Sequence, residues 1–248
     1  GNTDYYDELY KNKTFAQSHN VSISGSNGKI SYYTSGRIYD YDGLFNYTSD
    51  TYRTMNLRSK VSAQVFKWLK VSNNFDYTHD KYTQPLGASS VGGGLVWQGI
   101  NNEGHPSAPI FNPDGTLTKS GAYSLGGFIT GNNWIKRTTK TLKNTTTFNA
   151  NFFDNKLRLT SDFSFRTKDF IEDKKNTAIP YSEYEGVITY LGTPETDDKM
   201  SEKVQQTSYI STNAYAEFEN IFGGKHYIKL LGGYSKITGL RSLNVMAC

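Results

Sequence analysis

The chain contains segments in which apolar and polar residues alternate one by one. In the clearest of these segments, residues 157–168, charged and hydroxyl side chains fill the even positions. The apolar side chains fall at odd positions and are Leu157, Leu159, Phe163 and Phe165. Successive side chains of a β-strand point to opposite faces, whereas a helix would mix the two sets. The pattern therefore predicts a β-strand with one apolar face and one polar face.

The same period of two recurs along the chain. Residues 69–78 and 208–220 repeat it clearly. Weaker alternation marks five further segments, which are residues 18–25, 30–39, 51–61, 138–152 and 227–236. Together these segments predict an all-β chain with eight strands. The only helical signal is a short turn at residues 4–10, for which Asp4 is a candidate N-cap.

The links between the predicted strands alternate in length. Asn27-Gly28 predicts a tight hairpin turn, and residues 64–68, 153–155 and 221–225 are also short links. The other links, near residues 40–50, 79–137 and 169–203, are long. This alternation is typical of an outer-membrane barrel with short periplasmic turns and long extracellular loops. A soluble β-sandwich would show turn signals about every 8–12 residues.

The longest predicted loop holds three glycine- or proline-rich stretches. Asn112-Pro113-Asp114-Gly115 predicts a turn, because Pro fixes φ, Asp bonds the backbone and Gly takes positive φ. We interpret Gly92–Gly94 and Gly126-Gly127 as flexible loop residues. Four aromatic residues of this loop are candidate contacts for a ligand or for a lid protein, although packing within the loop would explain them equally well. They are Trp97, Phe111, Tyr123 and Trp134.

Composition narrows the class of protein. Aromatic residues make up 15% of the chain, which excludes a disordered chain, although the mean hydropathy is only -0.62. The chain has no apolar run of about 18 residues, so no transmembrane helix is predicted. A membrane barrel stays possible, because its alternating strands also average out as polar. The net charge of +4 is spread along the chain, so no nucleic-acid partner is predicted.

The charged side chains bear on the width of a barrel. Eight strands can close a small barrel. However, long basic side chains crowd the predicted strands and would be hard to pack inside one, namely Arg53, Arg58, Lys60, Arg158, Arg166 and Lys168. The sequence therefore predicts an arc of a larger antiparallel transmembrane β-barrel, with a wide lumen.

Signals for catalysis or metal binding are weak. The four histidines lie far apart, and neither an HExxH nor a CxxC motif is present. No nucleophile elbow or P-loop occurs, and 23 acidic residues give chance pairs rather than a catalytic pattern. Cys248 is the only cysteine, so it forms no intrachain disulfide. We therefore predict no enzyme, no cofactor and no metal site.

Several segments resemble the SusC/RagA-like family of TonB-dependent transporters. Residues 3–10, TDYYDELY, are similar to the T-D-W-x-D-E-[IL]-[FY] segment of that family. Residues 17–25, QSHNVSISG, are similar to its Q-x-H-N-L-S-[VI]-S-G strand, and residues 29–33, KISYY, match a K-x-x-Y-Y pattern. Residues 60–71 resemble the K-V-T-D-W-L-K-V turn, although AQVF at 63–66 departs from it. The resemblance is strong over residues 1–83 and diffuse beyond them.

The resemblance implies the role and the partners of the whole protein. Such a transporter has a barrel of about 22 strands, an N-terminal plug and a SusD-like surface lipoprotein, and it sits in the outer membrane of a Gram-negative bacterium. It imports oligosaccharides or peptides, driven through TonB. The expected partners are therefore outer-membrane lipid, a SusD-like lipoprotein, a glycan or peptide, and TonB. The plug and the TonB-contacting segment are expected to lie outside this chain.

The resemblance also divides the chain. Residues 1–17 would belong to an extracellular loop and residues 18–83 to the first four strands. Residues 84–137 would form a long loop, and residues 138–241 four further strands. The tail at residues 242–248 departs from the family pattern.

Two other classes of protein stay open on the sequence. One is a soluble or surface β-rich glycan-binding module, which would need no detergent and would show no consistent lipid-facing row. The other is a secreted β-rich glycoside hydrolase, which would turn over a glycan and lose activity when one acidic pair is changed. The alternation of short and long links favours the transporter over both.

Overall fold

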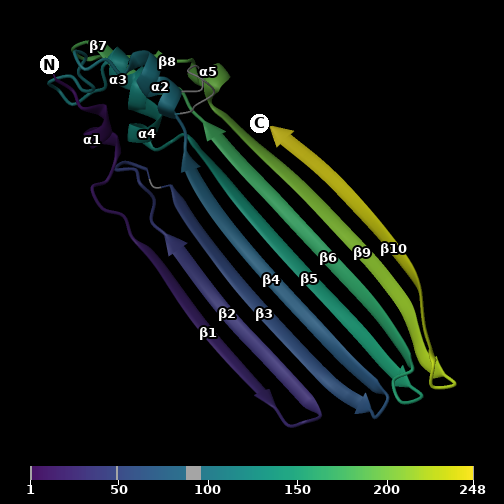
Figure 1. Ribbon diagram of the computed structural model, residues 1–248. Helices are drawn as coiled ribbons and strands as arrows, with labels where there is room; N and C mark the ends of the chain where they lie inside the picture. The colour runs from purple at the N-terminus through teal and green to yellow at the C-terminus, as the bar shows by residue number, and fades with distance from the viewer. Residues whose placement is uncertain (1, 49, 88–95, 248) are drawn as a thin grey trace.

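A computed structural model describes residues 2–48, 50–87 and 96–247 of the chain. These residues form one long antiparallel sheet with a small cap at one end (Figure 1). The sheet has eight strands in the order β1-β2-β3-β4-β5-β6-β9-β10, so each strand pairs with the next one along the chain except where the β7–β8 hairpin intervenes. The predicted all-β, eight-stranded antiparallel arrangement is confirmed.

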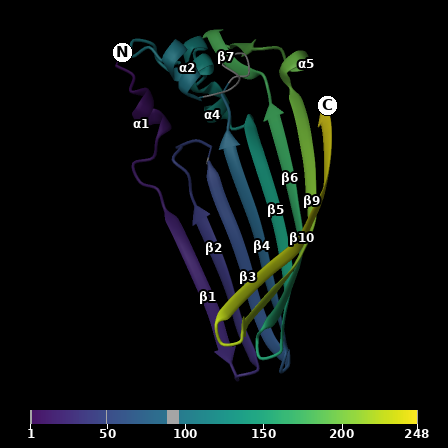
Figure 2. The same cartoon turned by 45° about the vertical axis from the view of Figure 1, so that its right-hand side comes forward.

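The strands of the sheet are long, and their length increases from 11 residues in β1 to 24 residues in β9. Their bounds are β1 (Ala16–Ser26), β2 (Ile30–Tyr41), β3 (Thr51–Phe66), β4 (Leu69–Pro85), β5 (Trp134–Phe152), β6 (Leu157–Asn176), β9 (Lys199–Phe222) and β10 (His226–Ala247). β10 thus includes residues 242–247, which the sequence sets apart as a tail. Figure 2 shows that the sheet is curved, with β10 passing in front of its neighbours in that view.

Four short turns join strands at the end of the sheet away from the cap (Figure 1). In the first turn Gly28 has φ +82° and Asn27 Oδ1 accepts hydrogen bonds from the N–H groups of Lys29 and Ile30, as an Asn-Gly hairpin requires. Three consecutive residues with positive φ, Phe153 to Asn155, turn β5 into β6. The predicted short links are therefore confirmed.

The long links gather at the opposite end and build the cap (Figure 1). Its elements are α1 (Tyr5–Leu9), α2 (Val96–Glu103), α3 (Lys119–Gly121), the π-helical η2 (Ala122–Gly126), α4 (Gly127–Thr130), β7 (Ile179–Tyr184), β8 (Val187–Leu191) and α5 (Pro194–Asp197). Asp4 caps α1, since its carboxylate accepts the N–H groups of Tyr6 and Asp7, which confirms the predicted N-cap.

The cap contains the main hydrophobic core of the described residues. Leu9, Leu125 and Phe128 are almost fully buried there and come from segments far apart in the chain. The sheet itself has few buried side chains, and many of its apolar residues are exposed. The cap thus packs as a small globular unit, whereas the sheet leaves apolar surface uncovered. None of the described helices is long and apolar enough to cross a membrane.

The interpretation of Gly126-Gly127 as flexible loop residues is wrong. These glycines lie in a continuous helical stretch, residues 119–130, formed by α3, η2 and α4. A Cβ added at Gly127 would lie 2.4 Å from the carbonyl oxygen of Leu86, so glycine lets this helix approach the end of β4 closely. Gly92–Gly94 lie outside the described residues.

Candidate functional site

The strand register joins the alternating patterns of separate strands into two faces. Val71 of β4 lies opposite Phe148 of β5, and Phe163 of β6 lies between Thr146 and Thr212. Residues directly opposite each other share a face. The apolar rows predicted separately for β4, β6 and β9 therefore lie on one face, which confirms their phase.

We call this side of the sheet the apolar face and the other side the polar face. The apolar face continues across all eight strands. Its larger apolar members include Val21, Ile23, Ile38, Met55, Leu57, Val61, Leu69, Val71, Phe75, Leu142, Phe148, Leu159, Phe163, Phe165, Ile210, Phe218 and Leu230.

The apolar face also has aromatic residues near both of its ends. At the turn end, the rings of Phe66, Trp68 and Phe152 stack with centroid separations of 5.5 and 5.3 Å. At the cap end, Lys136 Nζ lies 4.2 Å from the ring centroid of Trp134. Aromatic residues that flank an apolar band on both sides are characteristic of barrels in membranes.

Polar side chains within the apolar face bond to one another. The amide nitrogen of Asn73 donates to Asn144 Oδ1 at 3.0 Å and to Thr146 Oγ1 at 2.9 Å. The amide of Asn144 returns a bond of 3.1 Å to Asn73 Oδ1. Such mutual bonding keeps the amides satisfied without water, which suits a low-dielectric environment.

The polar face carries several ion pairs that cross from strand to strand. Arg58 on β3 lies 2.6 Å from Asp76 on β4, and Arg137 on β5 lies 2.6 Å from Glu172 on β6. Near the turns, a cluster of four charges links β6, β9 and β10. It consists of Arg158, Glu217, Glu219 and Lys229. Salt bridges of this kind need water nearby, because long charged side chains are costly to bury.

A group of basic residues on the polar face lacks such partners. Lys143 and Arg166 lie directly opposite each other on β5 and β6, and Lys168 follows two positions later. None of the three forms an ion pair with a carboxylate of the described residues. Like charges placed directly opposite are unfavourable when the medium does not screen them. The polar face therefore suits contact with water or with an anionic surface.

The structure separates the four predicted contact residues. Tyr123, in η2, packs partly buried against the cap core, and Phe111 forms a backbone bridge with Leu117 and is 36% exposed. Trp134 is the first residue of β5, paired with Pro85. Trp97 lies in α2, and its side chain is outside the described part of the structure. The hollows described below are lined by other residues.

One hollow lies on the cap beside the predicted turn at Asn112–Gly115. Gly115 N–H donates to the Asn112 carbonyl at 2.9 Å, and Gly115 has φ +84°, so this turn is confirmed. Hydrogen bonds from the hydroxyl and N–H of Thr116 lower the pKa of Asp114. The hollow has a volume of about 400 Å³ and is lined by Asn112, Pro113, Asp114, Ser182, Glu183, Tyr184 and Glu185.

We call this the acidic hollow, because three carboxylates line it together with the aromatic ring of Tyr184. Glu183 lies 3.1 Å from Lys119 Nζ, and this hydrogen-bonded pair raises the pKa of Lys119. Tyr184 is 74% exposed beside it. A surface lined by carboxylates beside an exposed tyrosine ring suits a partner that offers hydrogen-bond donors and an apolar patch. The sequence gives no local signal for this hollow, because residues 179–191, which form β7 and β8, lie in a segment with the pattern of a long loop.

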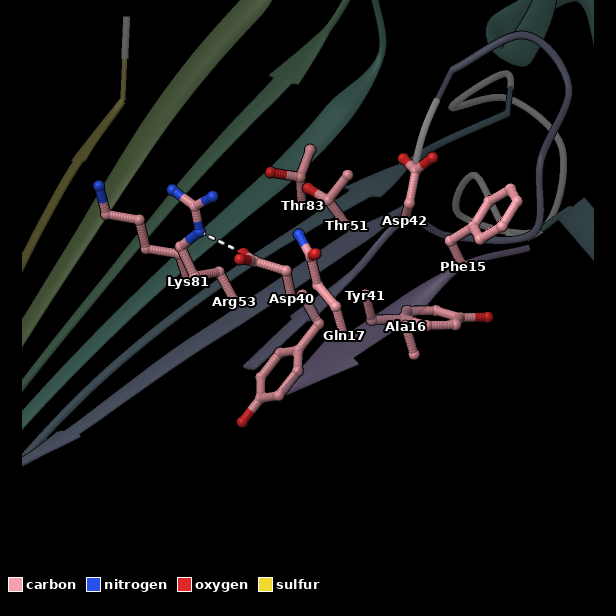
Figure 3. A pocket seen from close by; sticks show the side chains of 11 residues that line it. Phe15, Ala16, Gln17, Asp40, Tyr41, Asp42, Thr51, Arg53, Lys81 and Thr83 are labelled. Atoms are coloured by element: carbon pink, nitrogen blue, oxygen red, sulfur yellow. Dashed lines mark hydrogen bonds and ion pairs between the residues drawn. The ribbon is translucent and has the colours of Figure 1, made fainter. Parts of the chain in front are cut away.

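A larger hollow lies where the first four strands end near the cap. It has a volume of about 680 Å³ (Figure 3). Gln17, Asp40, Arg53 and Lys81 cross it as one row of directly opposed residues from β1 to β4. Thr51 and Thr83 form the next row toward the cap. Arg53 and Met55 are two positions apart on β3, so their side chains lie on the same face of the sheet. The row of Arg53 is therefore the continuation of the apolar face toward the cap.

We call this larger hollow near the cap the upper hollow. Its charges are only partly balanced. Arg53 Nε donates to Asp40 Oδ1 (Figure 3). Asp42 lies 3.9 Å from Lys11 Nζ, whereas Lys81 forms no ion pair with a described carboxylate. The arrangement offers a free ammonium group, an immobilised guanidinium and two hydroxyl groups on one side of the sheet. These are groups that bind anions.

No group of three or more potential metal ligands lies together among the residues that the structure describes. The segment Asp40–Gly43, whose acidic residues resemble a calcium loop only weakly, is the end of β2 and a bend in which Asp50 Oδ1 accepts the N–H of Leu44 at 2.6 Å.

Comparison with known proteins supports the fold. No family model and no curated protein matches the sequence. Among solved structures, the chain is similar to the RagAB peptide transporter, with 15% identity and a TM-score of 0.69 over 99% of this chain. It is also similar to the RagAB peptide importer in its "open-open" state, with 17% identity and a TM-score of 0.74, and in its "closed-closed" state, with 16% identity and a TM-score of 0.66.

The chain spans only 26–27% of the length of the chains that it resembles. The matches extend over 98–99% of this chain, so they include both the cap and the sheet. The similar structures are described as transporters rather than enzymes. The chain therefore has a SusC/RagA-like fold, equivalent to about a quarter of such a transporter chain.

Proposed function

We propose that this chain is part of the barrel wall of a TonB-dependent nutrient importer in the outer membrane of a Gram-negative bacterium. The observation that carries the proposal is the apolar face, which keeps one phase across the seven strands from β1 to β9 of the main sheet. Exposed apolar side chains in that number would be unfavourable in water. Contact with lipid acyl chains removes that cost.

The free edges of the sheet support a wall rather than a complete barrel. Among the described residues, β1 and β10 each pair with a strand on one side only. An unpaired strand edge in lipid leaves backbone N–H and C=O groups without partners, so spanning sheets must close. Further strands of the same transporter would supply the missing pairs and bring the total toward about 22.

The polar face would line the lumen of this barrel. Its ion pairs and its unpaired basic residues Lys143, Arg166 and Lys168 need water or anionic partners. A plug domain and a TonB-contacting segment would belong to other parts of the protein. The chain contributes wall, lumen charge and extracellular surface, and no catalytic step.

The cap would lie on the extracellular side, because short turns face the periplasm in such barrels. There it would meet a SusD-like lipoprotein and the substrate, which we propose to be peptides or oligosaccharides. Trp97, Phe111, Tyr123 and Trp134 remain proposed contacts for ligand or lid. The acidic hollow beside Tyr184 adds a polar surface to the same end of the molecule.

Fractionation of native cells tests this proposal directly. An antibody against residues 112–127 is expected to detect a band in the outer-membrane fraction that is far larger than the 27.9 kDa of this chain. A soluble band near 27.9 kDa would overturn the proposal and favour the glycan-binding module.

Uptake assays then identify the substrate. Cells lacking the gene are expected to lose import of labelled peptides or of labelled oligosaccharides, and to regain it when the gene is restored. Dependence on TonB is measured in the same assay with a strain that lacks TonB. Unchanged uptake of both substrate classes in the deletion strain would contradict an importer.

A further inference from the structure

The upper hollow, lined by Gln17, Asp40, Arg53 and Lys81, sits at a defined level of the sheet. On β3 the apolar-face positions run from Arg53 to Met55 and Leu57, and the row of Arg53 includes Lys81 of β4. The hollow therefore lies where the apolar face ends and charged residues begin. If the apolar face contacts acyl chains, as the proposed function requires, this level is that of the lipid headgroups.

The groups in the hollow match a phosphate. Lys81 is exposed and forms no ion pair with a described carboxylate, so its ammonium group is available. Arg53 is held in place by Asp40, and its terminal nitrogens point away from that carboxylate (Figure 3). Guanidinium and ammonium groups bind phosphate oxygens through short, charge-assisted hydrogen bonds. Thr51 and Thr83 place two hydroxyl groups in the row above.

The carboxylates of the hollow do not oppose this assignment. Asp40 is paired with Arg53, and Asp42 lies 3.9 Å from Lys11 Nζ. The hollow is lined by two basic residues, Arg53 and Lys81, and two acidic ones, and Lys11 is a third basic residue beside Asp42. Among the described residues both carboxylates are therefore paired, with Lys11 and Arg53, and the positive charge of Lys81 is left unbalanced in the hollow.

The surface beneath the hollow is suited to acyl chains. Ile38, Met55 and Leu57 lie on the apolar face next to it and are 40%, 44% and 45% exposed. A free phosphate ion would use the charged groups alone, whereas a lipid would also cover these side chains. We propose that the upper hollow binds the phosphorylated headgroup of an outer-leaflet lipid, with the acyl chains lying over Ile38, Met55 and Leu57.

Binding to the purified full-length transporter that contains this chain tests the proposal. The probe is bis-phosphorylated lipid A, titrated in detergent solution and measured by native mass spectrometry. We expect Lys81→Gln to weaken binding about tenfold, because a charge-assisted hydrogen bond is lost. Lys81→Arg is expected to retain binding, since it keeps the charge. The matched control is Lys143→Gln, which removes an exposed cation from the polar face and is expected to change nothing.

Two further probes separate lipid from free phosphate. Dephosphorylated lipid A is expected to bind wild-type protein as weakly as lipid A binds Lys81→Gln. Inorganic phosphate is expected to compete poorly with lipid A for the wild-type protein. If inorganic phosphate bound as tightly as lipid A, the lipid assignment would be overturned. Equal affinities of wild type and Lys81→Gln in a protein that fractionates with the outer membrane would overturn the site alone. A protein absent from the outer membrane would instead overturn the proposed function on which the site rests.

Discussion

Phe163 and Ser164 are neighbours in β6 that lie on opposite faces of the sheet. Phe163 is 48% exposed on the apolar face, whereas the Ser164 hydroxyl lies 2.8 Å from that of Thr145 on the polar face. We expect Phe163→Arg to reduce assembly into the outer membrane, because Arg near the bilayer midplane costs about 2–4 kcal/mol. Ser164→Arg adds a charge to a face that already carries Arg166, and it is expected to assemble normally.

The amount of each variant in the outer-membrane fraction, with heat-modifiable mobility on gels as a folding check, measures this difference. Equal behaviour of the two variants would contradict the assignment of faces. Wild-type protein expressed at the same level is the reference for both.

The face of each residue could be predicted from the sequence, but its contacts could not. Alternation is a local property, so the phase of Leu69 or Phe163 is visible in a short segment. The upper hollow instead joins Gln17, Arg53 and Lys81 from three strands, and only the strand register brings them together. The same limit applies to Trp134, which the sequence places in a loop because its pairing with Pro85 has no local signal.

At the scale of elements, the strands extend well beyond the segments that alternate. β9 has 24 residues and β6 has 20, whereas the pattern predicts about half that length. Past the apolar face both sides of the sheet are polar, as in Glu172–Asn176 of β6. The alternation then disappears although the hydrogen bonds between strands continue. Hydrophobic periodicity thus measures the apolar band of a strand and not its full length.

The sequence does not predict the helices of the cap, and the reason is different. Residues 119–130 are rich in glycine and serine, which favour loops when considered alone. Their helix is stabilised by contacts with other segments: Ala122 and Leu125 are fully buried, and Thr118 Oγ1 accepts the N–H of Gly121 at 2.9 Å. Tertiary packing overrides local propensity here, which a single sequence does not reveal.

Phe128 tests the independence of cap and sheet. Its side chain is 1% exposed, and its ring centroid lies 5.5 Å from that of Phe45. Its carbonyl oxygen accepts a hydrogen bond from the Thr48 hydroxyl. We expect Phe128→Ala to destabilise the cap by about 3–5 kcal/mol through the cavity that it leaves. Assembly of the sheet into the membrane is expected to persist, because few side chains of the sheet depend on that core. Hydrogen exchange resolved by segment measures both effects in one experiment.

The matched control for the cap is Tyr184→Ala. Tyr184 is 74% exposed on β7, so its removal is expected to change cap stability by no more than about 0.5 kcal/mol. Loss of exchange protection along β5 and β6 in Phe128→Ala would show that cap and sheet unfold together, contrary to the expectation.

For the whole molecule, the short turns largely determine the sheet order. Each tight link, such as the one at Asn27-Gly28, makes two consecutive strands antiparallel neighbours. The β7–β8 hairpin interrupts this simple order only locally, because β6 still pairs with β9. Curvature and the placement of the cap depend on the combined twist and packing of many residues, so the sequence predicts the topology but not the shape.

The two edges of the sheet lead to a prediction about the chain on its own. In the part of the chain that the structure describes, β10 pairs with β9 alone, and its residues are exposed along its length. Leu240 and Ile237 are 77% and 70% exposed there. We expect the isolated 248-residue chain to associate through β1 and β10 in aqueous buffer, because unpaired edges template further pairing. Sedimentation velocity measures the size distribution after refolding.

A variant with altered edge residues connects this association to β10. Ile237→Lys combined with Leu240→Lys places charges on the exposed strand, and charged side chains on an edge oppose pairing between molecules. We expect this variant to shift the distribution toward smaller species, whereas Lys substitutions at the exposed cap residues Tyr184 and Val187 should not. A monodisperse monomer of the unmodified chain would mean that the apolar face and both edges tolerate water. In that event the sheet would be a self-sufficient soluble module, and the barrel-wall assignment would fail with it.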